Sequence, residues 1–167
     1  LLREAPQWDE AIRKELHQLF EEKKALRRID EDEFKSLQEK WGRKLEALPS
    51  KVVITLKPGP RRKIRLVACG NFVDPASAEQ KDQCLYASGA DAVCLRYVLK
   101  RSAEESWKAS VLDIRTAFLN APLDIEAEGQ EPTMVVLKPP SLLLKTGHVG
   151  PKEYYLAQKA MYGLRQS

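Results

Sequence analysis

Cysteine and histidine are scarce in this sequence, and their spacing excludes several kinds of site. The three cysteines, Cys69, Cys84 and Cys94, are odd in number and show no C-x-x-C spacing, so neither a disulfide framework nor a zinc knuckle is predicted. His17 and His148 lie far apart and away from any cysteine pair, and we expect both at the surface. This cysteine usage favours a reducing compartment, the cytosol or the nucleus.

Long apolar runs are also missing. No stretch approaches the roughly 20 apolar residues that cross a bilayer, so no membrane partner is expected. The sequence opens with LLRE at residues 1–4, without a basic region followed by an apolar one, and we therefore expect a chain that is not secreted. The absence of an initiating methionine indicates a fragment or a segment of a polyprotein.

The net charge of the sequence is small as well. The 28 basic and 24 acidic residues leave a net charge of +4, which is too little to indicate a nucleic-acid partner by itself. The distribution of the charges along the chain therefore carries more information than their sum. A length of 167 residues suits one ordinary domain or a piece of a larger one.

The first fifty residues have a helical pattern. Apolar residues recur at three- and four-residue steps over residues 8–29, which predicts an amphipathic helix. Asp30 followed by Glu33 is typical of an N-terminal cap and predicts a second helix. Its apolar period runs on to Leu48, and Pro49 closes it. A coiled coil or a plain helical hairpin explains this segment as well as any functional interpretation does.

A basic β-hairpin is predicted next. Residues 52–56 and 63–69 are rich in β-branched and apolar side chains and flank a Pro-Gly turn. Alternation places Lys63 and Arg65 on one face, opposite Ile64 and Leu66. The hairpin carries a cluster of five basic residues: Lys57, Arg61, Arg62, Lys63 and Arg65. The charges suit a phosphate-rich ligand, and they equally suit a solvated edge that discourages aggregation.

The rest of the chain predicts an α+β fold, an antiparallel sheet with packed helices. Residues 71–90 look like a loop, and residues 92–100 predict a helix that buries one face. Further predicted elements are a strand at 110–114, a turn of helix at 115–119, a strand at 134–137 with a hairpin partner at 153–156 after a loop, and a helical stretch at 158–164.

Asp113 is unusual in its setting. A carboxylate among Val111, Leu112 and Ile114 is disfavoured in a strand, and burial of its charge is costly. Such a residue is usually paired, caps a turn or holds a cation, so Asp113 is a candidate metal ligand.

The residues around Asp113 resemble a known motif. Residues 111–120 read VLDIRTAFLN and are similar to LDVKTAFLNG, the first catalytic motif of copia-type retrotransposon reverse transcriptases, the RNA-directed DNA polymerases of Pol polyproteins. Three further blocks resemble that family in the same order: WDEA with a following EL in residues 8–16, KIRLVACG at 63–70 (KARLVAKG in the family) and AMYGLRQ at 160–166 (ALYGLKQ). Residues 134–140 look like the family's YM-x-x-P-P stretch.

The resemblance implies the fingers and part of the palm of a right-handed polymerase. Residues 1–50 would lead into the fingers, residues 51–109 would form the fingers with the basic hairpin, and residues 110–167 would form a partial palm. The activity implied is magnesium-dependent transfer of deoxynucleotides to a primer on an RNA or DNA template. Expected partners are that primer–template, deoxynucleoside triphosphates and the remainder of the Pol polyprotein, in cytoplasmic virus-like particles or the nucleus.

The resemblance also implies roles for single residues. Asp113 would be catalytic and bridge two Mg²⁺ ions, with the backbone carbonyl of Ile114 as a further ligand. Phe118 would pack beneath the incoming sugar and exclude a 2′-hydroxyl, although most Phe residues are simply core. The remaining implied contacts are Lys63 and Arg65 with the template or the triphosphate, Tyr162 and Gly163 with the nascent base pair, and Arg61 and Arg62 with nucleic acid.

Departures from the family pattern leave other interpretations of the chain's function open. No Tyr-x-Asp-Asp occurs in the sequence, so the remaining two carboxylates of the family are expected downstream, and the isolated chain is expected to be inactive. Ala121 stands where the family has Gly, and residues 81–90 lack the usual TFSPV-like segment. The alternatives are a non-catalytic nucleic-acid-binding remnant of a degenerate retroelement and a degenerate product without function.

Overall fold

The structure is a computed structural model that describes residues 6–41, 45–59, 61–70, 89–121, 123 and 134–164. The chain divides into two compact units: unit 1 comprises Leu1–Ala78 and Thr116–Ser167, and unit 2 comprises Glu79–Arg115. Within the described residues the fold is α+β, with four α-helices and a five-stranded, mostly antiparallel open sheet. The predicted loop at 71–90 lies outside the described residues except for positions 89 and 90.

Unit 1 begins with a helix that is shorter than predicted. Helix α1 (Asp9–His17) continues into the π-helical turn η2 (Gln18–Glu22), and the buried side chains of this stretch follow the predicted stripe. The prediction of helix up to residue 29 is wrong, because the φ of Lys24 is 49°, a value that a right-handed helix does not contain. Strand β1 (Leu26–Asp30) follows and pairs with β5, although its two buried residues, Leu26 and Ile29, are three positions apart.

The second helix begins as predicted and ends early. The side chain of Asp30 accepts a hydrogen bond from the Glu33 backbone N–H (2.7 Å), which confirms the N-terminal cap of helix α2 (Glu31–Trp41). The predicted continuation to Leu48 is wrong, because strand β2 (Ala47–Lys57) begins before Pro49 and includes it. Proline has no N–H to give to a ladder, but its carbonyl is used here: it accepts a hydrogen bond from the Cys69 N–H (2.9 Å).

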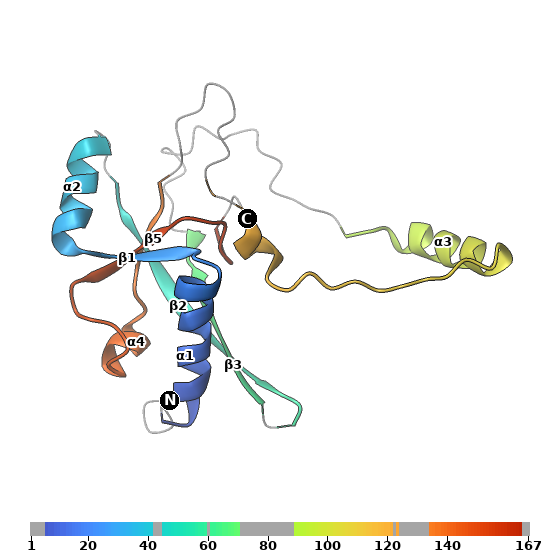
Figure 1. The fold of residues 1–167 in the computed structure, drawn as a ribbon, viewed down its shortest axis with the longest axis horizontal. Coiled ribbons are helices and arrows are strands. Elements are labelled where there is room, and N and C mark those ends of the chain that lie inside the picture. Colours follow the sequence, from blue (N-terminus) through green and yellow to red (C-terminus); the bar gives the residue numbers. More distant parts are fainter. Residues whose placement is uncertain are drawn as a thin grey trace. The chain divides into compact units, whose positions relative to one another are not determined.

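The sheet of unit 1 has the strand order β1-β5-β4-β2-β3 (Figure 1). Strands β2 and β3 (Arg61–Ala68) form the predicted antiparallel hairpin, with Val53 opposite Arg65. The short strand β4 (Val136–Lys138) pairs with β2 in parallel and with β5 (Glu153–Ala157) in the antiparallel sense. The predicted pairing of the two C-terminal strands is confirmed, although helix α4 (Ser141–Lys145) replaces the predicted loop between them.

The core of unit 1 lies between this sheet and α1. Tyr155, in β5, is fully buried, and its ring meets the edge of Phe20 with a centroid distance of 5.0 Å. The Tyr155 hydroxyl has no hydrogen-bond partner among the described residues, and burial raises its pKa. The largest fully buried side chains around it are those of Ile12, Leu19, Leu66, Leu119, Leu137, Leu143 and Met161.

The segment after β5 is not helical. The predicted helix at 158–164 is wrong, because its backbone bonds to other segments of unit 1: the Gln158 N–H donates to Ala25 O (2.8 Å) and the Ala160 N–H to Ala121 O (2.9 Å).

The predicted surface position of His148 is also wrong. Only 12% of its side chain is exposed, and its ring contacts Thr146 and Asp9.

Unit 2 contains helix α3 (Ala92–Glu104), which the Asp91 side chain caps by accepting a hydrogen bond from the Val93 N–H (2.6 Å). The helix is confirmed, but the prediction that it buries one face is wrong, because none of its described residues is buried. The predicted strand at 110–114 is wrong as well, since these residues have no regular structure and are exposed. Among the helices that the structure describes, none is long and apolar enough to cross a membrane.

Candidate nucleic-acid interface

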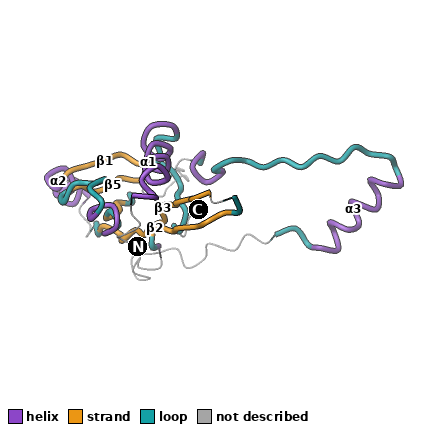
Figure 2. Tube along the Cα trace, turned by 90° about the horizontal axis from the view of Figure 1, so that it is seen from below, coloured by secondary structure: helices purple, strands orange, loops and turns teal. Residues whose placement is uncertain are grey.

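The hairpin of β2 and β3 carries the basic cluster that the sequence predicts. Figure 1 shows the hairpin extending beyond the other strands, and Figure 2 shows its turn at the tip. Along β3, Ile64 and Leu66 are buried, Arg65 is exposed and Lys63 is half-buried. The predicted division into a basic face and a core face is therefore confirmed. Because β3 is an edge strand, the basic face lies at the margin of the sheet.

The charges on this face repel one another. The pKa of Lys63 is lowered by partial burial and then by the nearby charges of Arg65 and Lys57. The carboxylate of Glu15, on α1, acts in the opposite direction, and it also accepts a hydrogen bond from the Leu66 N–H (3.1 Å). These neighbouring cations, with one carboxylate among them, repel one another, and a bound phosphate lowers that repulsion. This face therefore suits a polyanion.

The Tyr162–Gly163 segment, from the AMYGLRQ block, contacts the C-terminal end of β3. The Ala68 N–H donates to Tyr162 O (2.8 Å), and the Gly70 N–H donates to Gly163 O (3.0 Å). The Arg65 guanidinium lies over the Tyr162 ring, 5.3 Å from its centroid. The structure thus brings the predicted residues Arg65, Tyr162 and Gly163 together from two distant segments.

Glycine is required at position 163. Its φ is +88°, in the left-handed region, and a Cβ there would lie 2.1 Å from Ala68 O and 2.6 Å from a Val67 methyl carbon. A side chain would therefore separate the Tyr162–Gly163 turn from β3. The glycine of the AMYGLRQ block thus has a steric reason in this fold, independent of any ligand.

Arg61 and Arg62 differ in their surroundings. Arg61 lies at the exposed tip of the hairpin, opposite Lys57. Arg62 points to the α1 side, where its guanidinium donates to the Gln7 side-chain oxygen and lies 5.6 Å from the centroid of the Trp8 ring. Arg62 is therefore held against the turn that precedes α1, a contact that the sequence interpretation did not include.

The segment that carries Phe118 is anchored in unit 1. The 3₁₀ turn η4 (Ala117–Asn120) buries Leu119, and the Lys23 ammonium donates to the Asn120 side-chain oxygen (2.9 Å). Thr116, just before the turn, has a φ of 53°, which is a strained conformation for a β-branched residue. The side chain of Phe118 lies outside what the structure describes, so its role as a sugar gate stays a prediction.

Asp113 and Ile114 belong to unit 2, where both are exposed. The burial that made Asp113 unusual in the sequence is not observed, because Leu112 and Ile114 beside it are 90% and 71% exposed. Among the described residues there is no group of three or more His, Cys, Asp or Glu side chains that could hold a metal ion. The described residues therefore do not fit a two-magnesium centre.

Comparison of the sequence with protein-family models, with curated proteins and with solved structures found no match. The resemblance to copia-type reverse transcriptases therefore rests on the sequence motifs, and what the structure adds is the arrangement of the basic hairpin and the Tyr162–Gly163 turn.

Proposed function

We propose that this chain is the fingers and first palm segment of a copia-type reverse transcriptase, and that by itself it binds nucleic acid without extending a primer. The observation that carries the proposal is the contact between two motif blocks. Arg65, from the KIRLVACG block, stacks on Tyr162, from the AMYGLRQ block, and backbone hydrogen bonds hold the two segments together. An arginine on an aromatic ring beside further cations suits phosphates and stacked bases.

The catalytic part of the proposal depends on residues that this chain does not contain. In the family, two further carboxylates join the one matched by Asp113, and one carboxylate cannot hold two divalent ions. The proposed role of the 167-residue chain is therefore template and nucleotide contact through Lys63, Arg65 and Tyr162. Purified chain with Mg²⁺, primer–template and deoxynucleotides is expected to give no extended product.

The second candidate is a non-catalytic nucleic-acid-binding remnant of a retroelement. The same basic hairpin favours it, because binding to phosphates needs no metal centre. The coding sequence directly downstream separates the two candidates. An in-frame Tyr-x-Asp-Asp supports the polymerase segment, whereas an early stop supports the remnant.

The salt dependence of binding tests the interface itself. Each phosphate neutralised on a duplex contributes about 0.9 to the slope of log affinity against log salt concentration. The triple variant Arg61→Ala, Lys63→Ala and Arg65→Ala should therefore lower the slope by about 2 to 3 in fluorescence-anisotropy titrations with a labelled primer–template.

A matched control removes equal charge elsewhere in unit 1. The variant Lys35→Ala, Lys40→Ala and Lys145→Ala changes three cations of helices α2 and α4, and it should keep the parental slope. Equal slopes for the parent and the hairpin variant would show that the hairpin charges form only a solvated edge.

A further inference from the structure

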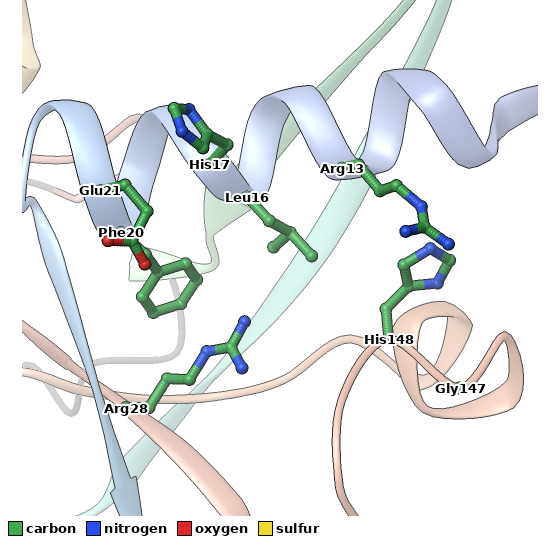
Figure 3. A pocket seen from close by; sticks show the side chains of 8 residues that line it. All are labelled: Arg13, Leu16, His17, Phe20, Glu21, Arg28, Gly147 and His148. Carbon is green, nitrogen blue, oxygen red and sulfur yellow. The ribbon is translucent and has the colours of Figure 1, made fainter.

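Helix α1 carries charged side chains on two sides, and on one of them the charges are balanced. On that side an open pocket of about 340 Å³ is lined by residues of α1, η2, β1 and the turn that follows α4. Figure 3 shows Arg13 beside His148, at some distance from Arg28. Arg13 pairs with Asp9 (2.7 Å), and Arg28 pairs with Glu153 (3.3 Å). The arginines of this pocket are thus matched by carboxylates.

On the other side of α1, Glu15 faces the basic hairpin. Its half-buried carboxylate accepts a hydrogen bond from the Leu66 backbone N–H of β3 (3.1 Å). The charged groups that act on this carboxylate are Lys63 and Arg65 of the same strand. Within the described residues neither cation forms an ion pair, and Arg65 stacks on Tyr162. Glu15 therefore acts on these two cations through space and leaves them accessible to a phosphate.

The hydrogen bond from Leu66 does not need a charged acceptor. Two and four residues further along β3, the N–H groups of Ala68 and Gly70 donate to backbone carbonyls of the Tyr162–Gly163 turn (2.8 and 3.0 Å). A neutral oxygen therefore satisfies this edge of the strand equally well. The fold requires an acceptor at Glu15 but not its negative charge, and that charge affects the neighbouring cations.

The charge of Glu15 and the charges of the hairpin are coupled. Burial raises the pKa of Glu15, and the Leu66 N–H, Lys63 and Arg65 oppose that rise, in this order. Glu15 in turn opposes the lowering of the Lys63 pKa that burial, Arg65 and Lys57 cause. A phosphate bound to Lys63 and Arg65 brings a second negative charge close to Glu15, and the two anions repel each other.

We propose that Glu15 competes with nucleic-acid phosphates for the cations of the hairpin, so that nucleic acid binds more tightly when the Glu15 carboxyl is protonated. This regulation rests on the nucleic-acid interface proposed above. The pKa of Glu15 lies above 4.5 in the free chain, and bound nucleic acid raises it further. The affinity is therefore lowest above both pKa values, rises as pH falls between them, and is constant below them. Binding takes up protons in that range.

The variant Glu15→Gln tests the effect of the charge, because its amide oxygen can still accept the Leu66 N–H. Fluorescence anisotropy with labelled oligothymidylate measures the affinity, since thymine has no group that titrates in the acid and neutral range. At pH 7 the variant should bind about threefold more tightly than the parent chain, because one repelling charge is gone. Its slope against salt should stay parental, because the number of neutralised phosphates is unchanged.

The pH dependence separates charge from packing. The ratio of the Glu15→Gln affinity to the parental affinity removes the titration of the histidines, which both proteins share. This ratio should fall from about three at pH 7 toward one as pH decreases through the pKa of Glu15. Equal affinities at pH 7, or a ratio that stays near three at pH 4 with both folds intact by circular dichroism, would overturn the proposal.

The same helix provides a matched control. Glu10→Gln removes an equal charge from an exposed position of α1, where solvent and salt screen it, and should change the affinity by less than about 1.5-fold. Equal gains for Glu10→Gln and Glu15→Gln would show that the net charge of the chain sets the affinity, and would reject a specific role of Glu15.

The hairpin variant Arg61→Ala, Lys63→Ala and Arg65→Ala separates this regulation from the interface itself. Added to that variant, Glu15→Gln should no longer tighten binding, because the cations for which Glu15 competes are absent. If the hairpin variant loses salt dependence while Glu15→Gln binds like the parent, the interface stands and the role of Glu15 is rejected. If the parent chain shows no salt-dependent binding, the interface and the role of Glu15 are both rejected.

Discussion

The two units of this chain differ in the burial of their apolar side chains. In unit 1, Leu137 and Tyr155 are fully buried between the sheet and α1, whereas in unit 2 the apolar residues of α3, such as Leu99 at 53%, remain exposed. Both stretches have an apolar periodicity in the sequence. The difference teaches that periodicity predicts a helix or strand, but burial requires a second layer. A helix of 13 residues without such a layer is marginal by itself.

The same substitution in the two units is expected to have the largest difference in effect. Leu137→Ala removes fully buried volume from unit 1 and should lower the free energy of unfolding by about 2 to 5 kcal/mol. Leu99→Ala removes exposed volume from α3 and should change it by less than about 0.5 kcal/mol. Urea denaturation followed by circular dichroism measures both. A comparable loss in the two variants would show that α3 buries Leu99 in solution, and the contrast between the units would fail.

A glycine pair sharpens the contrast within unit 1. Gly163→Ala should lower the free energy of unfolding by about 3 kcal/mol, because strain at positive φ adds to overpacking against Ala68 O. Gly147→Ala has a similar φ of +72° with nothing near its Cβ, and it should lose only about 1 kcal/mol.

Hydrogen exchange shows where the Gly163→Ala loss falls. The amides of β3 that face the Tyr162–Gly163 turn should lose protection, while those of α3 keep the parental rates. Loss of protection in α3 as well would mean that the two units unfold together.

The smallest expected effect is that of a substitution at Glu15 on the stability of unit 1, and this effect depends on pH. Burial raises the pKa of Glu15 above 4.5, against the opposing effects of the Leu66 N–H and then of Lys63 and Arg65. A carboxyl with a raised pKa binds more protons in the folded state, so its contribution is fully present below the unfolded pKa and is lost as pH rises through the folded pKa. Glu15→Gln should therefore stabilise unit 1 at pH 7 by a few tenths of a kcal/mol.

Thermal unfolding between pH 3 and pH 7 measures this effect. The gain of Glu15→Gln over the parent should disappear below the ordinary glutamate pKa. Glu10→Gln, on the exposed face of the same helix, should show no such gain. A gain that persists at pH 3 would place its origin in packing and not in the charge.

The elements that the sequence predicted correctly are those determined by residues that lie close together in the chain. The Asp30 cap of α2 and the β2–β3 hairpin depend on a few adjacent positions, and both are confirmed. Strand β1 was missed because its apolar residues also fit a helical period, and only the pairing of Ile29 with Tyr154 decides between the two.

The candidate interface was predicted in part. The motifs identified Lys63, Arg65, Tyr162 and Gly163, but not the stacking of Arg65 on Tyr162, since a contact between distant segments leaves no local pattern. The open pocket beside His148 had no sequence signal for a similar reason, because its lining residues come from α1, η2, β1 and the turn that follows α4. Asp113 was judged by its apolar neighbours, and these proved to be exposed.

The place of β5 in the sheet has a consequence for the order of events during synthesis. Strand β5 lies between β1 and β4, yet it follows both in the chain. Strand β1 pairs with β5, so the ribosome releases β1 long before its partner exists. The β2–β3 hairpin can close at once, because its partners are adjacent in sequence. We therefore expect the hairpin to form early and β1 to stay an open edge, the natural site for chaperone binding, until β5 emerges.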